Sequence, residues 1–142
     1  MKHLFLDTNV VLDFLIDRRP FSTSAAKLFD HSEKGHIKIY LSAVSYTTIY
    51  YIVKKLSTHK ETINVLKGLE KISETIDTTK EIIHASLNSG LKDFEDAIQY
   101  YSATSNKKIT AIVTRDLSDF KHSEISTIDP DEALSLIEST RP

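Results

Sequence analysis

The sequence predicts a single α/β domain built on a mainly parallel β-sheet with helices on both faces. Short apolar runs of strand length alternate along the chain with longer segments of helical periodicity. Strands separated by helices favour parallel pairing, because each crossover returns the chain to the same end of the sheet. The 142 residues, of which 40% are hydrophobic, show no internal repeat or low-complexity linker, so residues 1–142 are expected to form one domain.

The expected elements begin with a strand at the apolar run Leu4–Leu6, which ends at a polar triplet. Apolar residues then recur at helical spacing until Pro20, which ends the first helix. Ser22 or Ser24 can cap a second helix that runs to about Gly35. The amino end of the domain is therefore expected to read strand, helix, helix.

The middle of the chain predicts two more strands around a helical pair. Residues 37–41 alternate with period two and are typical of a strand. Residues 44–56 and 59–72 each carry an apolar face at helical spacing and predict two helices. A short strand is expected at residues 74–77.

The last third of the chain completes the alternation. Residues 80–88 predict a helix closed by a serine and a glycine, and the clearest helix of all begins at residue 93 and ends before residue 106. Residues 109–113 form an apolar, β-branched strand, and residues 125–128 a last short one. A final helix is expected over residues 129–138, with a proline in its first turn.

Composition excludes several kinds of chemistry. The chain has no cysteine, which rules out disulfides, thiol catalysis, thiolate-bound zinc and iron–sulfur clusters. Its three glycines are too far apart to form a dinucleotide-binding or P-loop motif. The formal net charge of −2 gives no overall basic character. We expect a cytoplasmic protein with no membrane span, since no apolar stretch approaches the ~20 residues that a span needs.

Five aspartates stand at the ends or beginnings of elements that should meet at one edge of the sheet. Ligands of α/β proteins bind beyond the carboxyl ends of the strands. These aspartates are Asp7, Asp93, Asp96, Asp116 and Asp119. Two such charges ~4 Å apart repel by about 4 kcal/mol at an effective dielectric constant near 20. Because oxygen ligands without thiolates favour hard divalent ions, the cluster predicts a Mg²⁺ or Mn²⁺ site.

Each aspartate also has a structural interpretation. Asp93 is a good helix N-cap, Asp7 or Thr8 can cap the first helix, and Asp96 follows Asp93 at the spacing of a capping box. Asp116 and Asp119 suit turns. Any one of the five taken alone favours the structural role, but five at the same end of their elements favour a site.

Three motifs in order resemble the PIN-domain ribonucleases, in particular the compact prokaryotic branch that includes VapC-type toxins. The motifs are Leu6-Asp7-Thr8-Asn9-Val10, Lys92-Asp93-Phe94-Glu95-Asp96-Ala97-Ile98-Gln99 and Ile112-Val113-Thr114-Arg115-Asp116, the last followed by Asp119-Phe120. Their order and spacing span nearly the whole chain. The resemblance implies a three-layer α/β/α Rossmann-like sandwich and metal-dependent hydrolysis of RNA phosphodiester bonds.

The resemblance also implies roles for individual residues. Asp7, Asp96 and Asp116 are the implied catalytic metal ligands. Asp93 and Asp119 resemble auxiliary metal-binding acids, Asn9 and Thr114 resemble groups that orient the carboxylates, and Arg115 is a candidate phosphate contact whose alternative is a local ion pair. The implied partners are an RNA substrate, an antitoxin protein and a second copy of the chain in a homodimer.

One position departs from the family pattern. Many members carry a glutamate in the helix after the second strand, where this chain has Thr47 or Thr48. A neutral hydroxyl does not supply the charge of a carboxylate, although Asp93 can compensate. The departure leaves open a degenerate PIN domain that binds RNA or protein without cleavage. A receiver-like phosphotransfer domain is a third reading, but Asp7 has no adjacent acid and Arg115 is not the lysine such a site needs.

Overall fold

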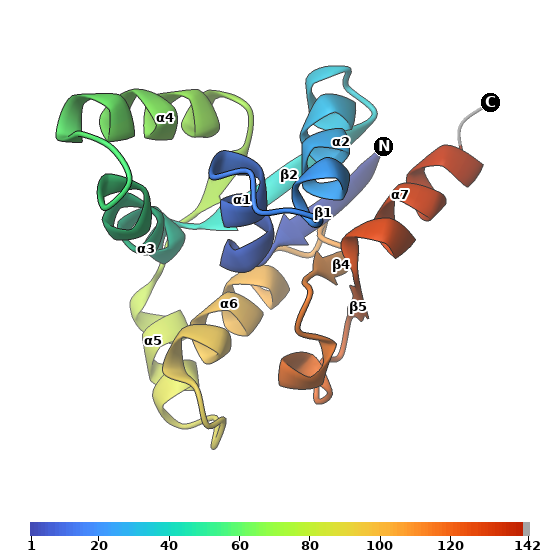
Figure 1. Cartoon of the computed structure of the whole chain (residues 1–142). Coiled ribbons are helices and arrows are strands. Elements are labelled where there is room, and N and C mark those ends of the chain that lie inside the picture. The colour runs from blue at the N-terminus through green and yellow to red at the C-terminus, as the bar shows by residue number, and fades with distance from the viewer. Residues whose placement is uncertain (141–142) are drawn as a thin grey trace.

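The structure is a computed structural model that describes residues 1–140. Five strands form one sheet in the order β3-β2-β1-β4-β5, and every neighbouring pair is parallel (Figure 1). The α/β class and the parallel sheet predicted from the sequence are confirmed. Within the described residues, no helix is long and apolar enough to cross a membrane.

The elements follow the predicted order. The strands are β1 Lys2–Leu6, β2 Ile37–Ser42, β3 Glu74–Ile76, β4 Ala111–Val113 and β5 Ser126–Ile128. The helices are α1 Thr8–Leu15, α2 Ser22–Glu33, α3 Ala43–Lys54, α4 His59–Lys71, α5 Lys80–Leu87, α6 Phe94–Thr104 and α7 Pro130–Ser139, with a 3₁₀ turn, η1, at Leu117–Phe120. The domain predicted over residues 1–142 includes 141–142, which lie outside the described residues.

The sheet separates two apolar layers, as the alternation of side chains along a strand requires. Leu4 and Leu6 of β1 point into a large core formed with α1, α2, α3, α4 and α7. Phe5 points the opposite way, into a smaller core with residues of α6 and η1. The result is the three-layer arrangement visible in Figure 1, in which α5 and α6 lie together on one side of the molecule.

Three local expectations differ from the structure. Helix α1 ends at Leu15, although helical spacing was expected to continue to Pro20. Neither Ser22 nor Ser24 caps α2, because Phe21 occupies the N-cap position without a side-chain hydrogen bond and Ser22 is the first helical residue. The strand expected at residues 109–113 begins at Ala111. Its first expected residue, Ile109, donates its backbone N–H to the carbonyl of Asn106 in a turn and is therefore unavailable to the sheet at that point.

The order of the strands places a switch point beside β1. The chain leaves β1 towards β2 on one side, whereas β4 pairs with β1 on the other side. The segments that follow β1 and β4 therefore run in opposite directions from two adjacent strand ends. Open α/β sheets bind their ligands in the crevice at such a switch point. Asp7 and Thr114 are the residues that directly follow these two strands.

Candidate active site

Asp7 is held in place by both of the strands that flank the switch point. Its backbone N–H donates to the carbonyl of Val113 (3.0 Å), which continues the β1–β4 ladder by one bond. Oδ1 of Asp7 accepts from the backbone N–H of Thr8 (2.8 Å), and Oδ2 accepts from the hydroxyl of Thr114 (2.8 Å). Asp7 therefore caps α1 and also presents a buried carboxylate, 6% exposed, at the sheet edge.

Thr114 and Asn9 organise the segment after β4. The Thr114 hydroxyl, fully buried, donates to Asp7 and accepts from the backbone N–H of Asp116 (3.0 Å). Nδ2 of Asn9 donates to Oδ2 of Asp116 (2.9 Å). Because one hydroxyl contacts both aspartates and an amide from α1 holds the second, Asp7 and Asp116 are fixed relative to each other.

The amino end of α6 supplies the next two aspartates. Asp93 is the N-cap, and its Oδ1 accepts from the backbone N–H of Asp96 (2.9 Å). Asp96 lies in the first turn and is half-buried, whereas Asp93 is exposed. Asp119, in η1, donates its backbone N–H to the carbonyl of Asp116 (3.0 Å). Asp93 therefore has the capping role that its position favoured, and it also brings a negative charge close to Asp96.

Burial and mutual repulsion perturb two of the carboxylates. Burial raises the pKa of Asp7 to about 6, with a further rise from the charges of Asp116 and Glu95 against the lowering effect of its two hydrogen bonds. Burial also raises the pKa of Asp96 to about 7, and the charges of Asp93, Asp7, Asp119 and Glu95 add to that rise. Strongly perturbed carboxylates that act on each other at a strand-end crevice are typical of a functional site.

Comparison with known proteins identifies the family. The family model described as PIN domain matches residues 3–118, most of the chain. The chain belongs to the PIN-domain family. The matched span includes all the aspartates at the sheet edge except Asp119.

Solved PIN-type structures share the fold at low sequence identity. VapBC-1 from nontypeable Haemophilus influenzae matches with a TM-score of 0.67 and 15% identity over 91% of this chain and 98% of that chain. VapC20 from Mycobacterium tuberculosis, a sarcin-ricin loop cleaving toxin, matches with a TM-score of 0.66 and 13% identity over 87% and 98%. DNA-bound VapBC from Salmonella typhimurium matches with a TM-score of 0.64 and 17% identity over 91% and 98%. No curated protein sequence matches the chain significantly.

The donor chemistry of this PIN domain fits a hard divalent cation. Asp7, Asp96 and Asp116 offer only oxygen, which Mg²⁺ and Mn²⁺ prefer. Burial, with a smaller contribution from neighbouring charges, raises the pKa of Asp7 and Asp96, and a bound cation would stabilise their ionised forms. Within residues 1–140, no three histidine or acidic side chains stand close enough together to hold an ion, so binding requires the carboxylates to turn towards one another.

Sequence reasoning missed Glu95 as a member of this cluster. Glu95 is partly buried in the first turn of α6, and its Oε1 accepts from the hydroxyl of Thr48 on α3 (3.2 Å). Side chains of adjacent residues on a helix point about 100° apart. The position of Glu95 next to Asp96 therefore gave no reason to place the two carboxylates at one site. The contact between Thr48 and Glu95 depends on how α3 and α6 pack, which no local sequence pattern predicts.

A buried polar chain beneath Asp7 was also missed. The hydroxyls of Thr8 and Ser45 are 2.9 Å apart, and Nε2 of Gln99 donates to Ser45 (3.0 Å). Ser45 and Gln99 are fully buried and come from α3 and α6. These bonds link α1, α3 and α6, the three helices whose amino-terminal regions form the site. A polar residue within an apolar helical stripe is the one sequence signal that could have indicated Gln99.

Arg115 makes the local ion pair that the sequence left as its alternative role. Its Nε and Nη2 donate to Oδ2 and Oδ1 of Asp13 (2.7 and 3.0 Å), and its guanidinium stacks 3.9 Å from the ring centre of Phe21. Asp13 is fully buried in α1 and also contacts Nε of Arg18 at 2.9 Å. The pair ties the Asp116 segment to α1, and the phosphate-contact role of Arg115 stays a prediction.

Replacing Asp96 by asparagine should stabilise the metal-free protein in a pH-dependent way. The raised pKa of Asp96 means that the native state holds a proton that the unfolded chain has lost, so stability falls as pH rises from about 4 to about 7. We expect the thermal midpoint of Asp96→Asn to exceed that of the native sequence by a few degrees at pH 8. The difference should vanish towards pH 3.5.

Asp30→Asn is the control for that measurement. Asp30 is exposed on α2, and its hydrogen bond and ion pair with Lys34 hold the pKa of its carboxyl below the usual value. Its substitution should therefore be neutral or slightly destabilising at pH 8. A melting series in a chelating buffer, in which Asp96→Asn is less stable than the native sequence at pH 8, would contradict the electrostatic description of the site.

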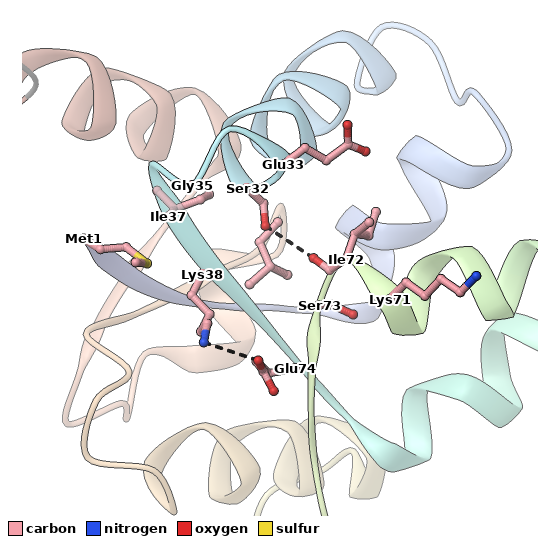
Figure 2. Close-up of a pocket in the computed structure, with 11 residues that line it drawn as sticks. Met1, Ser32, Glu33, Gly35, Ile37, Lys38, Lys71, Ile72, Ser73 and Glu74 are labelled. Carbon is pink, nitrogen blue, oxygen red and sulfur yellow. Dashed lines mark hydrogen bonds and ion pairs between the residues drawn. The ribbon is translucent and has the colours of Figure 1, made fainter.

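A separate groove of about 410 Å³ lies away from the aspartates of this PIN domain. Figure 2 shows its lining at the amino ends of β2 and β3, between the ends of α2 and α4. Lys38 and Glu74 form an ion pair across its wall (3.3 Å), and the Ser32 hydroxyl donates to the carbonyl of Ile72 (3.3 Å). The groove therefore lies at the amino ends of the strands, whereas Asp7 and Asp116 follow the carboxyl ends of β1 and β4.

Proposed function

We propose that this PIN domain is a Mg²⁺- or Mn²⁺-dependent endoribonuclease and the toxin of a toxin–antitoxin pair. The observation that supports the proposal is the coupling of carboxylates at the switch point: the Thr114 hydroxyl joins Asp7 to the Asp116 backbone, and the charge of Asp7 adds to the burial that raises the pKa of Asp96. A bound cation would neutralise the charges of these carboxylates and so remove the repulsion between them. Membership of the PIN family supports hydrolysis of a nucleic-acid phosphodiester.

The proposed chemistry assigns Asp7, Asp96 and Asp116 as ligands, with Asp93 and Asp119 as auxiliary acids. A bound divalent ion would activate a water molecule and offset the charge of the scissile phosphate. Thr114 and Asn9 hold the carboxylates that present those oxygens, and the burial of Asp7 keeps bulk water from that side of the site. We assign no single side chain as the general base.

The solved relatives support the substrate and partner that we propose. VapC20 is a sarcin-ricin loop cleaving toxin, which supports RNA as the substrate class. The Salmonella structure is a VapBC protein bound to DNA, which supports an antitoxin partner for this chain. We further propose a homodimer, as the family resemblance implies, and a cytoplasmic location.

Incubation of the purified protein with structured and single-stranded RNA tests the proposal. We expect cleavage with Mn²⁺ or Mg²⁺, loss of cleavage in excess chelator, and recovery when the metal is restored. Cleavage should also weaken below pH 7, because protons compete with the metal for Asp7 and Asp96, whose pKa values are about 6 and about 7. Cleavage that persists in chelator would refute the metal-dependent mechanism.

The threonine at position 48 of α3 favours one alternative function, a PIN domain that binds RNA or a protein without cutting. A site that lacks a carboxylate on α3 has less charge with which to hold a cation. Tight RNA binding that needs no metal, together with no cleavage of any tested RNA, would favour this alternative over the nuclease.

A further inference from the structure

Glu95 joins two helices at the acidic edge of the sheet. It lies in the first turn of α6, and its Oε1 accepts the hydrogen bond from Thr48, which lies on α3. Both residues belong to the span matched by the PIN-domain model. The hydroxyl therefore fixes one oxygen of a carboxylate that would otherwise be free to turn towards solvent.

The charge of Glu95 acts on the site and is not neutralised by a basic side chain. It is one of the charges felt by both Asp7 and Asp96, the two most perturbed carboxylates of the site. None of the ion pairs formed by residues 1–140 includes Glu95, Asp7 or Asp96. Holding a partly buried carboxylate beside two others opposes folding unless a cation or a proton neutralises part of the charge.

We propose that Glu95, positioned by Thr48, is a ligand of the divalent cation alongside Asp7, Asp96 and Asp116. The inference rests on the proposed function, since it assigns a residue to the same metal site. Thr48 occupies the region of α3 where a glutamate was expected, and its hydroxyl reaches a glutamate on α6. The carboxylate that the family pattern places on α3 is therefore supplied here by Glu95 of α6. Thr48 is a positioning residue, because it acts through Glu95.

Manganese titration monitored by electron paramagnetic resonance at pH 8 tests the role of Glu95 without measuring cleavage. Glu95→Gln keeps the size of the side chain and an oxygen for Thr48, so it removes only the charge. We expect its affinity for Mn²⁺ to fall by about 10- to 100-fold, comparable to the loss of a conserved partner in a metal site. The matched control Glu70→Gln removes an exposed charge on α4 and should bind as the native sequence does.

Three further variants test the role of Thr48. Thr48→Val removes the hydroxyl at constant shape and should weaken Mn²⁺ binding, whereas Thr48→Ser retains the hydroxyl and should restore it. The double variant Thr48→Glu with Glu95→Gln moves the carboxylate back to α3 and should recover affinity lost in Glu95→Gln. Circular dichroism melts confirm that each variant is folded, so that weak binding cannot be attributed to unfolding.

The outcomes separate this inference from the proposed function. If Asp96→Asn loses Mn²⁺ binding but Glu95→Gln binds as tightly as the native sequence, the role of Glu95 is overturned and the metal site stands. If the native protein binds no Mn²⁺ at millimolar concentration, both fall. Weakened binding in Glu95→Gln, with native binding in Glu70→Gln, supports the assignment.

Discussion

Replacing Asp7 by asparagine should reduce RNA cleavage by roughly 100-fold or more. The change removes the negative charge of the most buried of the proposed metal ligands. Asparagine is as good an N-cap as aspartate, so α1 should still begin at Thr8. The fold is therefore expected to survive, and the loss should appear in the turnover number and in metal affinity. Cleavage rates at saturating Mn²⁺ and circular dichroism melts measure the two effects separately.

Asp30→Asn is the matched control for Asp7→Asn. It makes the same chemical change on the exposed face of α2 and should cleave RNA at the native rate. A folded Asp7→Asn protein that cleaves within a few-fold of the native rate would contradict the assignment of Asp7 as a ligand.

Replacing Asp13 by alanine should destabilise the protein by about 2–3 kcal/mol, because it removes charged hydrogen bonds from a buried carboxylate while the two arginine partners, which are partly exposed, can be solvated. Asp13 is fully buried and contacts both Arg115 and Arg18. Its removal leaves two guanidinium groups without their carboxylate beneath the segment that carries Asp116. Urea unfolding should show the full loss, with a fall of roughly 10 °C in the thermal midpoint.

Asp30→Ala provides the comparison for Asp13→Ala. The Asp30–Lys34 ion pair, at 2.8 Å, is about as short as the Arg115–Asp13 pair, at 2.7 Å. Both of its side chains are exposed, so its loss should have little effect on the free energy of unfolding. We expect burial, and not ion-pair distance, to decide how much stability each substitution removes. Equal stabilities for the two alanine variants would show that the Asp13 cluster contributes nothing to the fold.

The parts of the fold that depend on local pattern could be predicted from the sequence. Each strand and helix has its own apolar periodicity, and the parallel sheet follows from their alternation. Asp7 and Asp116 could be selected because they follow strand ends, and the direction of a parallel sheet brings such ends to one edge. Their partners Thr114 and Asn9 came from the family resemblance, and the structure places both within hydrogen-bonding distance of the carboxylates.

Contacts between helices could not be predicted, because helix crossings depend on packing across the whole core. The Thr48–Glu95 and Ser45–Gln99 hydrogen bonds both join α3 to α6. The burial of Asp13 left a clearer signal, an acid within the apolar pattern of α1, but its two arginine partners lie 5 and 102 residues away. The sequence therefore predicted the candidate site, and the structure supplied the interactions that hold its residues in place.

A crystal structure with bound Mn²⁺ is the most direct test of the central claim. We predict an anomalous difference peak for one or two ions among the carboxylates of Asp7, Asp96 and Asp116, with Glu95 turned towards the same ion. Asp96→Asn crystals treated in the same way should lose the peak or show it much weakened. Native crystals that are saturated with Mn²⁺ and show no peak among these carboxylates would contradict the account.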